Sequence, residues 1–209
     1  MIIDKHIDKY NWDEIKDILP QITVIASLDL SEMKLTELPK MSHITINGSF
    51  NCSYNQITSF KDCPIVNGSF NCSFNQIKSF KYCPNIKGDF WCYSNQIKSF
   101  KYCPNIKGDF SCSLNQIISF KDCPLINGDF YCHDNQITSF KDCPEIRGYF
   151  HSDYNIFEKV LKYSKEKIIS LLGAQVELHN QQDEELFAHL DKFPDLVAYI
   201  RMKELNKLL

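Results

Sequence analysis

Ten cysteines are the residues of this chain whose type and spacing most readily suggest chemistry. They form two series, and within each series the members lie 20 residues apart: Cys52, Cys72, Cys92, Cys112 and Cys132, and Cys63, Cys83, Cys103, Cys123 and Cys143. Disulfides require specific pairs, and zinc knuckles use Cys-x-x-Cys pairs, which the sequence lacks. A repeated core position instead needs one small apolar residue per repeat, and free cysteine is among the most buried residue types. We therefore predict buried, reduced thiols, with disulfides or metal ligation as the alternatives.

A second group with the chemistry of a site consists of His133, His151 and Asp153, which occupy two consecutive repeats. Strands in neighbouring repeats would lie about 4.8 Å apart. Imidazole and carboxylate ligands at that distance would suit zinc or a similar metal. The alternative is an ordinary polar surface that faces a partner, and we predict no metal and no other cofactor.

Catalytic signatures are missing from the sequence. It contains no Gly-x-x-x-x-Gly-Lys phosphate loop and no Gly-x-Ser-x-Gly nucleophile elbow. All ten cysteines occupy repeated slots, so none of them is a convincing nucleophile. We therefore expect a protein that is not an enzyme.

The elements that must position these residues are copies of one 20-residue unit. The unit is Gly-x-Phe-x-Cys-x-x-Asn-Gln-Ile-x-Ser-Phe-Lys-x-Cys-Pro-x-Ile-x, with its asparagines at positions 55, 75, 95, 115, 135 and 155, and residues 28–41 form a degenerate earlier copy. The alternation Phe-x-Cys predicts a strand with Phe90 and Cys92 inside and Asp89, Trp91 and Tyr93 outside. The asparagine ends the strand, and its amide can satisfy backbone groups of neighbouring copies. Since one copy cannot bury its own apolar side, the copies must stack into a solenoid of parallel strands.

The motif Phe-x-Cys-x-x-Asn-Gln-Ile resembles the Leu-x-Leu-x-x-Asn-x-Leu core of leucine-rich repeats. The period of 20 and the proline in each copy are similar to the shortest class of these repeats, found in bacterial effector proteins. The variant Gly-Asp-Phe-x-Cys-Ser-x-Asn looks like uncharacterised repeat proteins of bacteria and their phages. The resemblance covers residues 22–157 and implies an α/β solenoid, a leucine-rich-repeat arc of short parallel strands. Phenylalanine and cysteine replace most of the leucines.

The chain is expected to divide into three parts. Residues 1–20 are predicted to form an N-terminal capping helix, because Ile7, Tyr10, Trp12, Ile15 and Leu19 follow a helical spacing up to Pro20. Residues 21–157 form the solenoid. Residues 158–209 show apolar positions at helical spacing and are expected to form C-terminal helices that cap the solenoid or dock a partner.

The composition and charge of the chain limit its expected partners and cellular location. The chain has 209 residues and a formal net charge of −3, which implies no global attraction to nucleic acid or membrane. Its N-terminal residues carry acids and bases throughout, and no apolar run reaches membrane-spanning length. We expect a soluble, cytoplasmic protein.

The residue positions that vary between copies of the repeat indicate a function in binding. The buried slots barely change, whereas the outward strand slots do, and exposed tryptophan and tyrosine typically anchor interfaces. The predicted partner-binding residues on the concave strand face are Asp89, Trp91, Tyr93, Asp109, Asp129, Tyr131, His133, Tyr149, His151 and Asp153.

The expected partner is another protein. The resemblance adds a biological use, a phage or bacterial factor that blocks or redirects a host protein such as a component of its defence. The alternative is nucleic-acid binding through a lysine that recurs on the outer edge. That lysine occupies positions 61, 81, 101, 121 and 141, and further basic residues lie near it at positions 78, 87, 98, 107 and 147.

Overall fold

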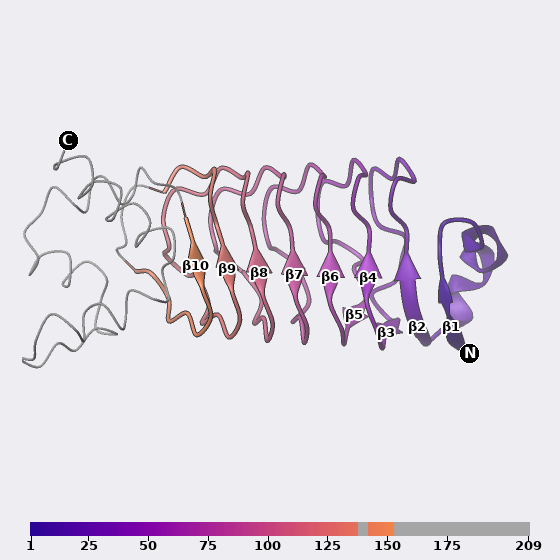
Figure 1. Cartoon of the computed structure of the whole chain (residues 1–209). Coiled ribbons are helices and arrows are strands. Elements are labelled where there is room, and N and C mark those ends of the chain that lie inside the picture. Colours follow the sequence, from indigo (N-terminus) through magenta and orange to yellow (C-terminus); the bar gives the residue numbers. More distant parts are fainter. Residues whose placement is uncertain (138–141, 153–209) are drawn as a thin grey trace, which may run out of the picture.

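The computed structural model describes residues 1–137 and 142–152, and in this part the protein is a parallel β-solenoid (Figure 1). Successive turns stack side by side and contribute one short strand each to a ladder. The strands of this ladder are β2 (Val24–Asp29), β4 (Phe50–Asn51), β6 (Phe70–Asn71), β7 (Phe90–Trp91), β8 (Phe110–Ser111), β9 (Phe130–Tyr131) and β10 (Phe150–His151). From β4 onward the register places each phenylalanine beside the phenylalanine of the next turn. The 20-residue period therefore sets the register.

A second parallel ladder runs beside the first. It consists of β3 (Thr45–Ile46) and β5 (Ile65–Val66) and continues from Val66 as single bridges through Ile86, Ile106 and Ile126 to Ile146. The longer β2 belongs to both ladders, pairing with β3 through Ile25 and with β4 through Leu28. In the later turns the chain bends between the two ladders at the repeated glycine of each unit, and we call this bend the glycine corner.

The glycine corner is a place of close approach between turns. The N–H of Gly108 donates to the carbonyl oxygen of Gly88 at 3.1 Å. A Cβ atom at Gly108 would lie 2.8 Å from the carbonyl carbon of Gly88, which is closer than real side chains come to backbone. The repeated glycine is therefore required by the spacing of the turns.

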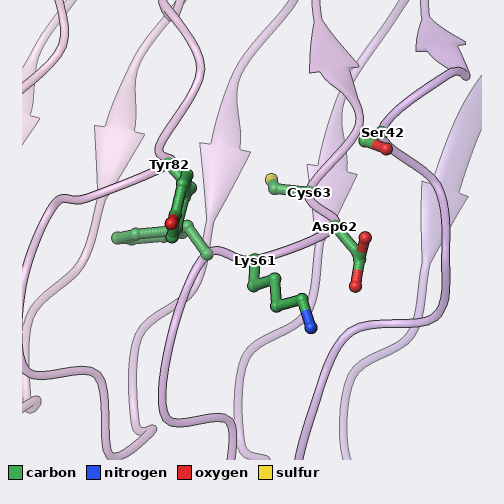
Figure 2. Close-up of a pocket in the computed structure, with 6 residues that line it drawn as sticks. Ser42, Lys61, Asp62, Cys63 and Tyr82 are labelled. Atoms are coloured by element: carbon green, nitrogen blue, oxygen red, sulfur yellow. The ribbon is translucent and has the colours of Figure 1, made fainter.

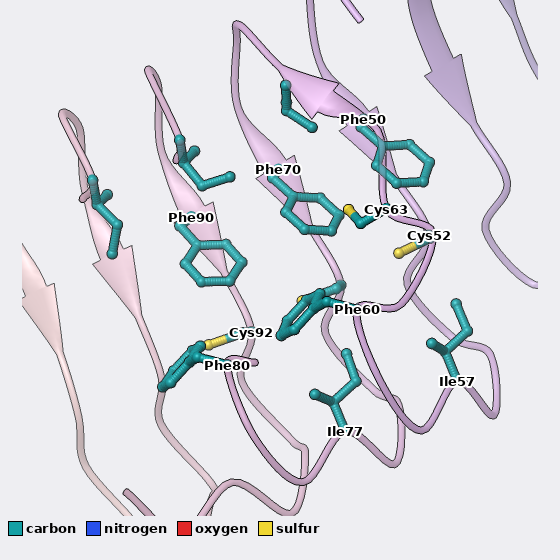
Figure 3. Close-up of a cluster of buried hydrophobic side chains, with 14 of the residues drawn as sticks. Phe50, Cys52, Ile57, Phe60, Cys63, Phe70, Ile77, Phe80, Phe90 and Cys92 are labelled. Carbon is teal, nitrogen blue, oxygen red and sulfur yellow. The ribbon is translucent and has the colours of Figure 1, made fainter. Parts of the chain in front are cut away.

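Aromatic rings form the centre of the core (Figure 3). The strand phenylalanines stack ring on ring, with centroids 5.5 Å apart for Phe70 and Phe90 and 5.6 Å apart for Phe90 and Phe110. The segment that leads from one strand of the first ladder back to the next turn is called the return path. Phe80 belongs to the return path of its turn and lies edge-on to Phe90 at 6.1 Å. Each of these rings is fully buried. Burying a phenylalanine contributes roughly 1.5–3 kcal/mol, so the repeated rings are a main source of stability.

The thiols lie in two columns beside these rings. The strand column is buried throughout, whereas the return-path column is buried at Cys63 and partly buried at Cys83, Cys103, Cys123 and Cys143. All ten are free cysteines in this structure, and the predicted burial holds for six of them, whereas the other four are only partly buried. Burial raises the pKa of the Cys143 thiol to about 12 and that of the Cys92 thiol well above its usual value. The thiols therefore act as small apolar groups, because the reactive thiolate is strongly disfavoured.

The asparagine of each unit ties neighbouring turns together, as the sequence predicted. The Nδ2 of Asn95 donates to the carbonyl oxygens of Cys92 in its own turn and Cys72 in the preceding turn, both at 3.1 Å. Its Oδ1 accepts the backbone N–H of Ile77 at 2.9 Å. The side chain is 8% exposed, so water cannot replace these bonds.

Replacing this asparagine is expected to destabilise the fold. Asn95→Ala leaves the buried N–H of Ile77 without a partner, at a cost of about 1–3 kcal/mol. It also removes one of the two hydrogen bonds that each of the carbonyl oxygens of Cys72 and Cys92 accepts, which adds about 1 kcal/mol for each. We expect a loss of about 3 kcal/mol in the free energy of unfolding, measured by urea denaturation. Gln96→Ala, at the next position along the chain, is the matched control, because its side chain is partly exposed. An unchanged urea midpoint for Asn95→Ala would contradict the role given to the amide.

The N-terminal segment corrects the predicted capping helix. Residues 1–20 form strand β1 (Ile2–Ile7), which pairs in parallel with β2, followed by the 3₁₀ helices η1 (Trp12–Glu14) and η2 (Lys16–Gln21). The side chains of Trp12, Ile15 and Leu19 are buried as expected, whereas Tyr10 is 85% exposed. A helix could cover the apolar end of the core but could not satisfy the backbone groups of β2, and β1 does so.

The predicted α/β class is corrected to a β-solenoid. Residues 1–137 and 142–152 contain no α-helix, and none of their helices is long and apolar enough to cross a membrane. The return path of each turn begins and ends with a residue of positive φ, such as Ser94 at 54° and Tyr102 at 67°, and these interrupt any helix. The predicted C-terminal helices of residues 158–209 lie outside the described residues.

Candidate interaction face

The strand face is the solvent side of the first ladder, and its residues form three rows along the solenoid. The outer row is Ser49, Ser69, Asp89, Asp109, Asp129 and Tyr149; the middle row is Asn51, Asn71, Trp91, Ser111, Tyr131 and His151; the inner row is Ser53, Ser73, Tyr93, Ser113 and His133. Within these described rows no residue is lysine or arginine. The outward direction predicted for Trp91 and Tyr93 is confirmed, since Phe90 and Cys92 between them are fully buried and both aromatic residues are partly exposed.

The aspartates of the outer row have a structural task that the sequence did not reveal. The Oδ1 of Asp89 accepts the backbone N–H of Asp109 at 2.9 Å, and the Oδ1 of Asp109 accepts that of Asp129 at 2.8 Å. The Oδ1 of Asp129 accepts the N–H of Tyr149 at 2.8 Å. Each carboxylate therefore bridges two turns through one oxygen. Within the described residues, the Oδ2 atoms of Asp89 and Asp109 accept no hydrogen bond, so both remain available to a ligand.

Tyr131 is held in place on both sides. Its ring stacks on the His151 ring of the next turn with centroids 4.5 Å apart and planes 1° from parallel. Its hydroxyl donates to the Oδ2 of Asp129 at 3.3 Å. Partial burial, and then the negative charge of Asp129, raise the pKa of the Tyr131 phenol. The ring is therefore a fixed surface, which favours binding because little freedom is lost.

The proposed metal ligands have other partners. The Nδ1 of His133 lies 3.0 Å from the Oγ of Ser113, and its Nε2 lies 3.9 Å from Asp134, while His151 stacks on Tyr131. Asp153 lies outside the described residues. Among the residues that are described, no three histidine, cysteine or acidic side chains are grouped so that they could hold a metal ion.

A fourth row of exposed apolar side chains was missed in the sequence. Tyr54, Phe74 and Leu114 directly precede the asparagine of their repeats, have φ near 55° and are 54%, 36% and 48% exposed. Tyr54 stacks on Phe74 at 4.2 Å, and Phe74 meets the edge of Tyr93 at 5.1 Å. Positive φ is unfavourable for such bulky residues. Their variation between copies, at a turn position where glycine or asparagine would fit more easily, was the signal that could have found them.

The outer edge of the return path carries lysines and tyrosines. The Nζ of Lys81 lies 4.8 Å from the ring centre of Tyr82, and that of Lys101 lies 5.1 Å from Tyr102. Both rings are largely exposed, and both tyrosines have positive φ, where three other copies have aspartate. The lysine edge therefore combines positive charge with exposed aromatic rings.

A pocket of about 400 Å³ opens on the same edge (Figure 2). Its lining residues are Ser42, Phe60, Lys61, Asp62, Cys63 and Tyr82. Cys63 is the group in it that could attack a substrate, but burial raises its thiol pKa well above the usual value. The pocket thus offers a surface for contact and no activated nucleophile.

Comparison with protein-family models, with curated proteins and with the solved structures finds no match to this chain.

Proposed function

We propose that the protein is a binding protein that holds another protein on its strand face. The observation that supports this most strongly is the position of the variation between repeats. The phenylalanines, asparagines and glycines that build the turns are constant, whereas the middle row changes from asparagine to tryptophan, serine, tyrosine and histidine. Packing does not demand these changes, because the side chains leave the core.

The chemistry of the face favours a protein as the partner. It combines aromatic rings with carboxylates, and within its described rows it carries no lysine or arginine. Tryptophan and tyrosine dominate the energetics of protein interfaces. A row of carboxylates repels the phosphates of nucleic acids and attracts basic protein surfaces. The resemblance to repeat proteins of bacteria and phages suggests a use in blocking or redirecting a host protein.

The proposal is tested by affinity capture from an extract of the organism that encodes the protein. Wild type is compared with Tyr131→Ala on the strand face and Lys101→Glu on the lysine edge. We expect a protein that binds wild type and Lys101→Glu but is lost with Tyr131→Ala. A partner that needs Lys101 and tolerates Tyr131→Ala would overturn the strand-face proposal.

The lysine edge supports a second candidate function, the binding of single-stranded nucleic acid. Exposed tyrosines next to lysines match the combination of stacking rings and phosphate-binding charges that such proteins use. The test is the affinity for a single-stranded oligonucleotide as salt is varied. A nucleic-acid binder loses affinity steeply with added salt, and Lys81→Glu with Lys101→Glu would flatten that slope.

A further inference from the structure

Both aromatic rows of the strand face are interrupted at the same turn. In the middle row Ser111 of β8 lies between Trp91 of β7 and Tyr131 of β9, and the register pairs it with both. In the inner row Ser113 lies between Tyr93 and His133. We call the interruption of the middle row the β8 gap, with Ser111 as its floor and Trp91 and Tyr131 on its sides. In the inner row Ser113 is buried, and its Oγ lies 3.0 Å from the Nδ1 of His133, so this contact closes the inner end of the gap.

The orientation of Tyr131 shows which way its ring can receive a ligand. His151 of β10 stacks on one face of this ring. Strands β8 and β10 lie on opposite sides of β9 (Figure 1). Because His151 of β10 covers one face of the ring, the other face is turned toward the β8 gap. On the far side of the gap, the Trp91 indole has no ring partner and no hydrogen bond among the described residues. Two aromatic side chains thus flank a position that has no ring of its own.

The width of the gap suits one planar group. Trp91 and Tyr131 are two strand spacings apart, about 9.6 Å at roughly 4.8 Å per strand. A flat group midway would lie about 4.8 Å from each ring, which is within the roughly 6 Å range of cation–π contacts. It would also extend the stacking already present between Tyr131 and His151.

The charge next to the gap selects a cation. Asp109 precedes Ser111 by two residues on the same side of the strand, so its carboxylate lies about 7 Å along the strand from the floor. Its Oδ1 is occupied by the N–H of Asp129, and its Oδ2 accepts no hydrogen bond within the described residues. Asp89 offers a second such oxygen on the Trp91 side.

We propose that the β8 gap binds an arginine side chain of the partner protein, stacked between Trp91 and Tyr131 and paired with the Oδ2 of Asp109. This proposal rests on the proposed function of the strand face. Guanidinium is the protein group that is planar, always charged, able to stack on aromatic rings and able to donate to carboxylates at its edge. Lysine lacks the plane, and a nucleobase brings a phosphate that the aspartates repel.

The experiment uses the full chain and three short peptides, Ac-Gly-Ser-X-Ser-Gly-NH₂ with arginine, lysine or citrulline as X. Citrulline keeps the planar shape of arginine and removes its charge. Binding is followed by the NMR signals of the indole N–H groups, since the chain has two tryptophans and Trp91→Phe identifies the signal of Trp91. We expect the arginine peptide to shift the Trp91 signal and to bind about tenfold more tightly than the citrulline peptide, with lysine in between.

Two variants place a phenylalanine in the middle row, one inside the β8 gap and one, as its control, away from it. Ser111→Phe puts a ring into the gap, and we expect it to abolish the shift caused by the arginine peptide. Asn51→Phe puts a ring into the same row at a distance from the gap, between Asp29 and Asn71, and we expect it to leave the response unchanged. It also removes the hydrogen bonds of Asn51 with Asp29 and Ser53, so its urea midpoint is measured beside the response. Loss of the response in both variants would overturn the assignment to the β8 gap.

The remaining outcomes separate this inference from the proposed function. Equal binding of the citrulline and arginine peptides, or a response of Trp91 to oligo-deoxythymidylate instead of to arginine, would overturn the arginine site. If the arginine peptide fails but Tyr131→Ala still abolishes capture of the partner, the strand face stands and the arginine site fails. If capture survives Tyr131→Ala and also Trp91→Ala, the proposed function itself fails.

Discussion

The protein is expected to unfold steeply at alkaline pH, at values where most proteins of its size remain folded. Burial raises the pKa of the cysteine thiols in the folded state, in most of them well above the ordinary value, as at Cys52, Cys63, Cys72, Cys83, Cys92, Cys103, Cys112, Cys123 and Cys143. In the unfolded chain these thiols ionise at about pH 8.5. At pH values between the thiol pKa of the unfolded chain and the higher thiol pKa of the fold, the unfolded state holds fewer protons than the folded state. The free energy of unfolding therefore falls as pH rises.

The sign and size of this effect follow from proton linkage. Below about pH 8 the thiols are protonated in both states and have no effect on the pH dependence. Above pH 8.5 each thiol that stays protonated in the fold reduces stability by about 1.4 kcal/mol per pH unit. Several such thiols together exceed a typical total stability of about 5–15 kcal/mol within one to two pH units. Urea denaturation in steps from pH 7 to pH 10 measures the decline.

The double variant Cys83→Ala and Cys103→Ala is the matched control for this effect. It is expected to be less stable than wild type at pH 7, because packing is lost, but to decline less steeply with pH. The slope should be smaller by about 2.7 kcal/mol per pH unit, which is twice the value for one thiol. Equal slopes would mean that these thiols ionise inside the fold. Thiol titration at neutral pH adds a check, since few groups should react before unfolding and ten afterwards.

Trp91→Ala is expected to have the largest effect on function. The indole stands at the centre of the strand face, and truncating a central tryptophan of an interface costs about 2 kcal/mol or more, equivalent to at least about thirtyfold in affinity. The fold should be little affected, because Trp91 is partly exposed and lies outside the core. The measurement is the affinity for the captured partner, together with the urea midpoint of the variant.

Lys101→Glu is the control for this prediction, because it changes an exposed residue on the opposite edge of the turn. We expect its affinity for the partner to stay within about twofold of wild type, as is usual for substitutions away from an interface. Partner binding that survives Trp91→Ala and fails in Lys101→Glu would move the site to the lysine edge. Asp109→Lys is less informative, since it also removes the hydrogen bond to the N–H of Asp129.

Much of the fold was determined by the sequence alone, because the repeat imposes the same constraint in every turn. A residue type that recurs every 20 positions must meet the same surroundings each time, so the buried Phe90 and Cys92 and the bridging Asn95 could be predicted. The direction of Trp91 followed from the alternation of the strand. The period itself predicted the parallel register.

Tertiary structure alone decided the features that depend on contacts between turns or on the ends of the solenoid. At the N-terminus the apolar spacing fitted a helix, but pairing with the open edge of β2 favoured strand β1. The bond from Asp129 to the Oδ1 of Asp109 joins turns 20 residues apart, and no local pattern marks it. The same holds for the stacking of His151 on Tyr131, because a sequence lists which residues face outward but only the stacked turns place one ring on another.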